Sequence, residues 1–202
     1  MLTLYHAPNS RSSTIIALIE ELGLQSKVTI TEVSVRRADG SGGPDPKNPH
    51  PEGKVPYLTS GTDHVFERAA IVAFLIDLAP DHPMGRAVGD PQRGAYLSWL
   101  AYYQGVVEPV LVLHMAGVAH PVLSATFRDL DHVTSRLSAT LDTQPYLLGD
   151  RYSAVDLLLA SPFHWMPDIA PSGSSLADWI ARCAARPSVA AIAKRELALL
   201  AN

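Results

Sequence analysis

The sequence of 202 residues contains a single cysteine, Cys183, and this scarcity excludes several classes of protein. One thiol cannot form an intramolecular disulfide, a CxxC redox pair or a cysteine-rich zinc site, so we expect Cys183 to be an inert buried thiol. The histidines are scattered without an H-E-x-x-H or H-x-H cluster, so no metal site is expected. The composition therefore predicts a protein of a reducing, intracellular compartment.

An excess of positive charge is also lacking. The 16 basic and 20 acidic residues give a net charge of −4, and no run of Lys or Arg could neutralise a phosphate backbone. Nucleic acid is therefore not an expected partner. The N-terminus has no basic segment and only a short apolar stretch, unlike a signal peptide. We expect a cytoplasmic protein.

One long stretch is almost without charge. Between residues 94 and 127 the only Asp, Glu, Lys or Arg is Glu108. Pro109 and Pro121, together with two histidines, argue against a membrane span, so no membrane is expected as a partner. A helix that is apolar on most faces packs against several neighbours, so this segment is expected to be a central or subunit-interface helix.

The first eighty residues or so alternate between strand and helix patterns. Hydrophobic periodicity predicts strands at 2–6 and 28–35, a helix starting near residue 13, a loop at 36–52, a hairpin at 57–59 and 64–66, and a helix at 69–78. We read Tyr5, on the first strand, as a core residue. The order of these elements predicts a small α/β unit with a mixed sheet.

The rest of the chain has a helical pattern. Turn-forming residues fill the segment 81–91, and helices are predicted at 91–117, 121–141, 153–166, 174–185 and 188–200. Ser153 and Asp156 have the S-x-x-D spacing of a capping box before an apolar run, which is a folding device and not a chemical site. The predicted organisation is an α/β domain at 1–80, a linker at 81–91 and an all-helical domain at 92–202.

Four segments carry a family resemblance when they are taken together: YHAPNSRS at 5–12, HPEGKVP at 50–56, ERAAI at 67–71 and GDRYSAVD at 149–156. With these motifs, nearly the whole chain resembles the cytosolic glutathione S-transferases of bacteria. The resemblance implies a thioredoxin-like N-terminal domain with a mixed four-stranded sheet, followed by a helical-bundle domain that holds the electrophile site and the dimer contacts. It further implies a homodimer that adds the thiolate of glutathione, its co-substrate, to small apolar electrophiles, as in detoxification.

A glutathione transferase must hold a thiol as the thiolate, although a free thiol titrates near ~8.5. The resemblance places the hydroxyl of Ser10 beside the sulfur, where it acts as a hydrogen-bond donor near a helix N-terminus. Ser12 competes for this role, and either serine could instead only cap the helix. No cysteine lies in this turn, which disfavours the disulfide-exchange chemistry of the family.

Glutathione itself is expected to bind along the next two motifs. The resemblance implies a cis bond between Val55 and Pro56, with the backbone of Val55 pairing with the cysteinyl unit of glutathione; a trans proline that starts a strand is the alternative. His50 and Lys54 are candidate partners of the glycyl carboxylate, or are simply solvated.

Glu67 opens the following helix, and here the sequence departs from the family pattern. The resemblance implies a Ser or Thr after this acidic residue, where it holds the γ-glutamyl carboxylate, but the chain has Arg68. Arg68 either binds the carboxylate as a charged donor or fills the pocket and weakens glutathione binding. The second outcome would leave a binding or regulatory protein with little turnover.

The electrophile site is the least specified by the sequence. Tyr102, Tyr103 and His114 lie on the helix that walls this site in the family, although an aromatic stripe at helical spacing also suits a core. A glutathione-dependent peroxidase would use the same thiolate and differ only in its acceptor.

Overall fold

The chain forms two units in the computed structural model, which describes residues 1–200 apart from the side chains of Pro167, Leu199 and Leu200. The first unit consists of residues 1–82 together with the segment that begins at Pro187, and the second is Pro83–Arg186. The sequence analysis assigned the whole of 92–202 to the helical half. The structure differs there, because the last helix packs on the first unit.

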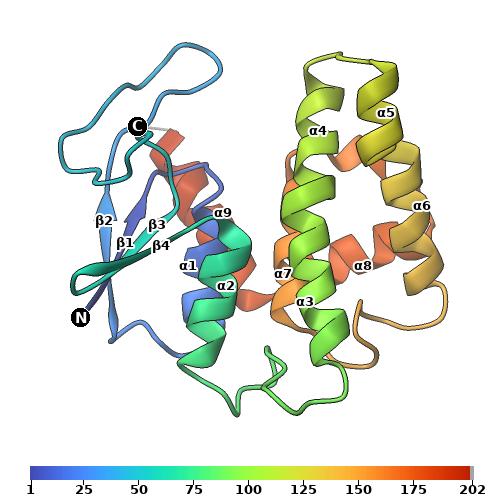
Figure 1. Ribbon diagram of the computed structural model, residues 1–202, viewed down its shortest axis with the longest axis horizontal. Helices are drawn as coiled ribbons and strands as arrows, with labels where there is room; N and C mark the ends of the chain where they lie inside the picture. Colours follow the sequence, from blue (N-terminus) through green and yellow to red (C-terminus); the bar gives the residue numbers. More distant parts are fainter. Residues whose placement is uncertain (201–202) are drawn as a thin grey trace. The chain divides into compact units, whose positions relative to one another are not determined.

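The first unit is built on a mixed four-stranded sheet. β1 (Leu2–His6) alternates buried and partly exposed side chains, as a half-buried strand should. It pairs in parallel with β2 (Val28–Glu32) and antiparallel with β3 (Tyr57–Ser60), which pairs antiparallel with β4 (Asp63–Phe66). The strand order is therefore β2-β1-β3-β4 (Figure 1).

Helices pack on the sheet through the buried side of β1, which carries Leu2, Leu4 and His6. The helix α1 (Ser13–Glu21) contacts both α2 (Arg68–Asp77) and α9 (Pro187–Leu200). It ends in a Schellman motif: the N–H of Leu24 donates to the carbonyl of Ile19, and the N–H of Gly23 donates to the carbonyl of Glu20. Gly23 has φ +64°, a conformation that glycine adopts without strain.

The connection between β2 and β3, residues 33–56, contains no helix or strand, so the loop predicted at 36–52 is confirmed. The strand predicted at 28–35 is shorter than expected and ends at Glu32. Tyr5 stands opposite Tyr57 in the sheet and is only half-buried, on the opposite side from Leu4. Reading Tyr5 as a core residue was therefore wrong, because the alternation of β1 turns it away from the helices.

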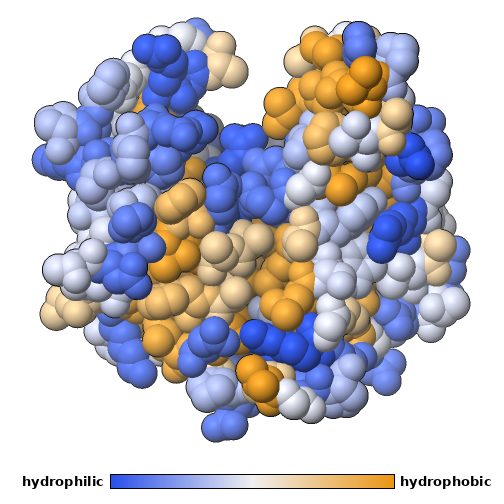
Figure 2. Space-filling view, in the orientation of Figure 1, coloured by the Kyte–Doolittle hydropathy of each residue, from blue (hydrophilic) through white to orange (hydrophobic). Residues whose placement is uncertain are grey.

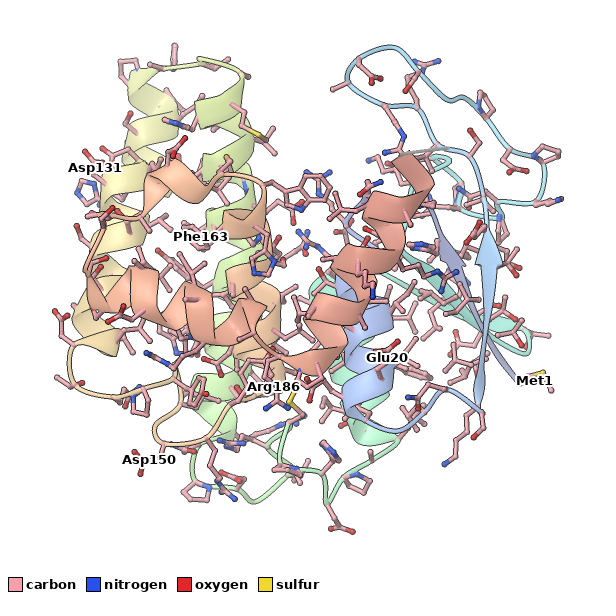
Figure 3. The ribbon with its side chains drawn as sticks, turned by 180° about the vertical axis from the view of Figure 1, so that it is seen from behind. Met1, Glu20, Asp131, Asp150, Phe163 and Arg186 are labelled. Carbon is pink, nitrogen blue, oxygen red and sulfur yellow. The ribbon has the colours of Figure 1, made fainter. Side chains whose placement is uncertain are left out.

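The second unit is helical throughout its regular elements. A continuous helical stretch comprises α3 (Arg93–Tyr102), a π-helical turn (Tyr103–Val107) and α4 (Glu108–Met115). The other elements are α5 (Pro121–Phe127), α6 (Leu130–Leu141), α7 (Ala154–Ala160), α8 (Ser175–Ala184) and short 3-10 turns at Ser161–His164 and Pro167–Ile169. Its core includes Phe163, which is labelled in Figure 3, and Trp179. The rings of these two residues meet edge to face.

Two helix predictions in this unit were wrong in length. The predicted helix 121–141 is broken at Arg128, which has φ +69°, and Asp129 caps the new helix by accepting a hydrogen bond from the N–H of His132. The predicted helix 153–166 is α-helical only over α7 and then tightens into a 3-10 turn. The predicted capping box is confirmed: the N–H of Ser153 donates to Asp156 Oδ2 at 2.9 Å.

The nearly uncharged segment 94–127 is less buried than we expected. α5 has no buried residue, and α4 buries only Val110 and Leu111. Large apolar side chains are exposed around the α4–α5 connection instead, and Figure 2 shows hydrophobic surface there; they are Val112, Met115, Val118 and Val122. Among the described residues, no helix combines the length and the hydrophobicity needed to cross a membrane.

Candidate functional site

The turn between β1 and α1 brings Ser10 and Ser12 together. Their hydroxyl oxygens lie 2.7 Å apart, and the N–H of Ser12 donates to Ser10 Oγ at 3.2 Å. Asn9, just before them, has φ +53°, which turns the chain sharply into the helix. The two serines that compete for the donor role in the sequence analysis are therefore hydrogen-bonded to each other just before α1.

The two hydroxyl groups differ in access. Ser12 is 0% exposed, and its Oγ lies within hydrogen-bonding distance of His6 Nδ1 at 2.8 Å and of the backbone N–H of Ala7 at 3.2 Å. Ser10 is only partly buried. A molecule that approaches this turn from solvent therefore meets the hydroxyl of Ser10 before that of Ser12.

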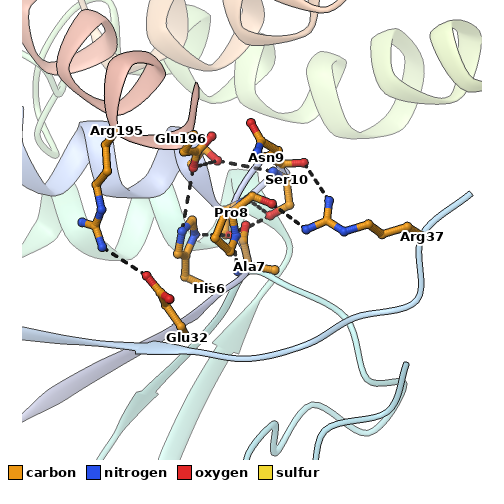
Figure 4. A network of polar contacts seen from close by, with 11 residues as sticks. His6, Ala7, Pro8, Asn9, Ser10, Glu32, Arg37, Arg195 and Glu196 are labelled. Atoms are coloured by element: carbon orange, nitrogen blue, oxygen red, sulfur yellow. Dashed lines mark hydrogen bonds and ion pairs between the residues drawn. The ribbon is translucent and has the colours of Figure 1, made fainter. Parts of the chain in front are cut away.

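Sequence reasoning missed the polar groups behind the serines. Ser13 Oγ donates to Glu196 Oε1 of α9 at 2.5 Å, and His6 Nε2 lies 3.8 Å from the same oxygen (Figure 4). Burial lowers the pKa of His6 to about 4, so its ring is neutral at neutral pH. The alternation of β1 was the one available signal, because it places His6 on the buried side with Leu2 and Leu4.

Arg37 supports the same turn from the long loop after β2. Its Nη2 donates to the carbonyl of Pro8 at 2.7 Å, and its Nη1 donates to the carbonyl of Asn9 at 3.3 Å (Figure 4). No sequence pattern marks Arg37, because loop geometry sets this contact. The guanidinium group satisfies two carbonyl groups that precede Ser10 and so holds the turn in place.

The second motif reaches the sheet at Val55 and Pro56. The peptide bond between them is cis, as the resemblance implied. His50 packs edge to face on Tyr57, with ring centroids 5.2 Å apart, and its Nδ1 accepts the N–H of Glu52 at 3.0 Å. A neutral His50 therefore carries its proton on Nε2, where it is available as a donor.

Lys54 is exposed and forms an ion pair with Glu52. The hydrogen bond and charge of Glu52 raise the pKa of Lys54, so the ammonium group is charged at neutral pH. The structure thus places a cation and an imidazole in one short loop that leads into β3. Whether either binds an anion stays a prediction.

The third motif forms the start of α2. Glu67 is its N-cap residue, with φ +66° and ψ +131°, a conformation that costs free energy for any residue but glycine. The side chain of Glu67 is exposed, whereas Arg68 is only 6% exposed. A guanidinium group thus stands in the first turn of a helix, where backbone N–H groups also favour an anion.

Comparison with known proteins now identifies the architecture. Residues 111–187 match the family model of the glutathione S-transferase C-terminal domain. A glutathione transferase from Methylococcus capsulatus superimposes with a TM-score of 0.79 at 23% identity, over 97% of this chain and 98% of that one. The chain has the glutathione transferase fold. The first unit is its thioredoxin-like part and the second is its helical part, as the sequence analysis predicted.

Two further structures agree with this fold. BphK, a bacterial glutathione transferase solved as a ternary complex, has a TM-score of 0.77 at 24% identity, over 96% of this chain and 98% of that one. A sphingomonad glutathione S-transferase complexed with glutathione has a TM-score of 0.76 at 22% identity, with the same coverage. No curated protein matches the sequence significantly.

In this glutathione transferase fold, the predicted electrophile residues lie in the helical unit. Tyr103 is fully buried and begins the π-helical turn. Tyr102 is half-buried, packs edge to face on Trp99 and lies under Arg136, whose guanidinium carbon is 4.4 Å from the ring centroid. His114 is exposed at the end of α4. The three side chains thus differ in access, and only Tyr102 and His114 present surface to a ligand.

The remaining reactive groups lie elsewhere in the glutathione transferase fold. Cys183 is buried in α8, and burial raises the pKa of its thiol. Across residues 1–200, no group of three or more His, Cys, Asp or Glu side chains is arranged to hold a metal ion. The β1–α1 turn itself contains serines and no cysteine.

Proposed function

We propose that the protein is a glutathione transferase that adds the thiolate of glutathione to small apolar electrophiles, as detoxifying enzymes do. The observation that carries the proposal is the hydroxyl of Ser10, partly exposed at the start of α1 and hydrogen-bonded to Ser12 behind it. A thiolate at this point accepts a hydrogen bond from Ser10 and lies near the N-terminal end of the helix. Ser12 is a supporting residue.

Glutathione binds along the edge formed by the other two motifs. The backbone N–H and carbonyl of Val55 pair with its cysteinyl unit, in the way that a strand adds to a sheet. His50 Nε2 and the ammonium group of Lys54 receive the glycyl carboxylate. Arg68, with Glu67 before it, receives the γ-glutamyl carboxylate at the start of α2.

The electrophile binds to the helical unit, where Tyr102 and His114 contribute to its site; Tyr103, the third predicted residue, is fully buried and does not reach a ligand in this structure. The π-helical turn that begins at Tyr103 supports this assignment, because such turns occur frequently at functional sites. An apolar electrophile requires apolar and aromatic walls, which this helix supplies.

We further propose a homodimer in the cytoplasm. Val112, Met115, Val118 and Val122 form an exposed apolar set around the α4–α5 connection, and a symmetric contact would bury it. A reducing compartment fits the single buried Cys183.

A second candidate is a binding or regulatory protein that keeps the fold without turnover. Arg68 favours it, because its long side chain is buried where the resemblance implies a small hydroxyl residue. A glutathione-dependent peroxidase is a third, and it would use the same thiolate.

Titration calorimetry with glutathione, followed by turnover assays, tests the proposal. The transferase predicts saturable glutathione binding and conjugation of at least one electrophile, both measured beside Ser10→Ala. Binding without turnover of electrophiles or hydroperoxides would support the regulatory protein. Turnover of hydroperoxides alone would support the peroxidase.

A further inference from the structure

Hydrogen bonds lead from Ser10 to a buried histidine that the proposed function does not use. Ser10 Oγ lies 2.7 Å from Ser12 Oγ, and Ser12 Oγ lies 2.8 Å from His6 Nδ1. Beyond the ring, His6 Nε2 lies 3.8 Å from Glu196 Oε1 (Figure 4). Polar groups therefore stand in line from a partly exposed hydroxyl to a carboxylate that is 6% exposed.

We propose that His6 and Glu196 complete a proton relay that begins at Ser10 and takes up the proton of the bound thiol. This inference rests on the proposed function, since it requires glutathione beside Ser10. His6 and Glu196 act through the two hydroxyl groups and do not touch the substrate, so they are positioning residues.

The transfer balances as a series of proton shifts. The S–H group gives its proton to Ser10 Oγ, Ser10 gives its own proton to Ser12 Oγ, and Ser12 gives its own to His6 Nδ1. Each hydroxyl group gains one proton and loses one, so both stay neutral. One S–H bond breaks and one N–H bond forms. The products are a thiolate that accepts a hydrogen bond from Ser10 and an imidazolium ring that faces Glu196.

The surrounding backbone favours this direction. The N–H of Ala7 donates to Ser12 Oγ, and the N–H of Ser12 donates to Ser10 Oγ, both at 3.2 Å. Each oxygen thus accepts one backbone proton and keeps one lone pair for the preceding group in the relay. The carbonyl of Ala7 competes as an acceptor for the Ser12 proton, but at 3.3 Å it is farther away than His6 Nδ1.

The charges around His6 decide whether its ring can accept the proton. Burial lowers the pKa of His6 to about 4, so Nδ1 has a free lone pair at neutral pH, but the ring is then a much weaker base than a thiolate. The transfer therefore depends on anions beside the ring that raise this pKa. Glu32 of β2 opposes this shift and Arg195 of α9 adds to it, and these two side chains pair with each other at 3.1 Å. When the ring takes up a proton, Glu196 lies on one side of it and the new thiolate on the other. Two anions therefore offset the cost of a buried cation.

Glu196→Gln tests the relay, because it removes the charge and keeps an oxygen that can accept from Ser13. The measurement is the pKa of bound glutathione, taken from the ultraviolet absorbance of the thiolate against pH, beside its affinity from calorimetry. We expect that pKa to rise by about one unit, a tenfold loss of thiolate at neutral pH, with little change in affinity. Glu20→Gln on α1, outside the hydrogen-bonded line, is the matched control and should leave the pKa unchanged.

His6→Gln should raise the same pKa, and if this variant does not fold, Glu196→Gln decides alone. The relay is overturned if Glu196→Gln binds glutathione and its thiol pKa equals that of the parent protein. A parent protein that binds no glutathione contradicts the proposed function and the relay together, and this result is distinct from the first.

Discussion

Trp179 Nε1 donates a hydrogen bond to Asp156 Oδ1 at 3.0 Å, which joins α8 to the start of α7. The same oxygen accepts the N–H of Leu147 at 2.9 Å, while Oδ2 accepts both the N–H and the hydroxyl of Ser153. Asp156 is 0% exposed, so the carboxyl group and its donors are out of contact with bulk solvent. The side chain that caps α7 thus also accepts buried hydrogen bonds from Leu147 and from Trp179 of α8.

Asp156→Ala should therefore destabilise the protein by more than the loss of a helix cap. A lost cap costs about 0.5–2 kcal/mol, but this change also leaves buried donors without an acceptor, for a total of about 3–5 kcal/mol. Ser153→Ala should lower the free energy of unfolding only by the contribution of the helix cap, about 0.5–2 kcal/mol. Chemical denaturation measures both, with Asp150→Ala, an exposed carboxylate nearby, as the control. Equal losses for Asp156→Ala and Ser153→Ala would contradict this prediction.

The capping box shows what local spacing can predict. Ser153 and Asp156 are three residues apart, so their hydrogen bonds follow from the helix itself and were predictable. The bond from Trp179 depends on how α8 packs, which no local pattern contains. The order of strands and helices in the first unit was predictable because it also depends on local signals. The hydrophobic period of each segment and the turn residues that flank it specify each element separately.

The site behind the serines was not predictable in this way. Ser13 and Glu196 are separated by 183 positions and meet only because α9 packs on α1. The sequence pattern of α9 is that of any helix, so it gave no reason to move this segment from the helical unit to the first. The break at Arg128 was missed because Arg is an ordinary helix former and no Gly or Pro marks the turn.

Ser10→Ala should lower turnover at neutral pH and leave glutathione affinity nearly unchanged. The hydroxyl stabilises the thiolate more than the thiol, and each ~1.36 kcal/mol of lost stabilisation lowers the thiolate population about tenfold. The measurements are the pKa of the bound thiol and the turnover number. If Ser12→Ala raises that pKa and Ser10→Ala does not, Ser12 is the donor.

Arg68 separates the two main functional candidates. If Arg68 binds the γ-glutamyl carboxylate, Arg68→Ser should leave glutathione affinity equal or weaker, and Arg68→Glu should abolish binding by charge repulsion. If Arg68 fills the pocket, Arg68→Ser should strengthen binding. We expect the first result, because a buried anion is better offset by a guanidinium group than by a neutral hydroxyl. Calorimetry with the two variants and the parent protein checks it.

The exposed apolar residues near the α4–α5 connection predict the oligomeric state. Light scattering at micromolar concentration should give the mass of a dimer, and Met115→Glu or Val122→Glu should shift it toward a monomer. Val88 is 92% exposed in another loop, so Val88→Glu is the control for adding a charge to an exposed valine. A dimer that tolerates both changes would place the contact elsewhere.

The last prediction concerns stability against pH and follows from His6. Burial lowers its pKa from 6.5 to about 4, so between these values the unfolded chain binds a proton that the folded protein does not. The contribution of His6 to the free energy of unfolding is therefore fully present above about pH 6.5 and is lost as the pH falls toward 4. Between about pH 7 and about pH 5 the loss amounts to about 2 kcal/mol.

Chemical denaturation at both pH values measures this loss as the fall in the free energy of unfolding. His6→Gln removes the titrating group, so its unfolding free energy should fall less over the same interval, whatever its absolute stability. His64→Gln, a change at an exposed histidine of β4, should retain the dependence of the parent protein. If His6→Gln and the parent lose the same free energy, His6 is not held neutral by burial, and the relay loses the neutral acceptor on which it depends.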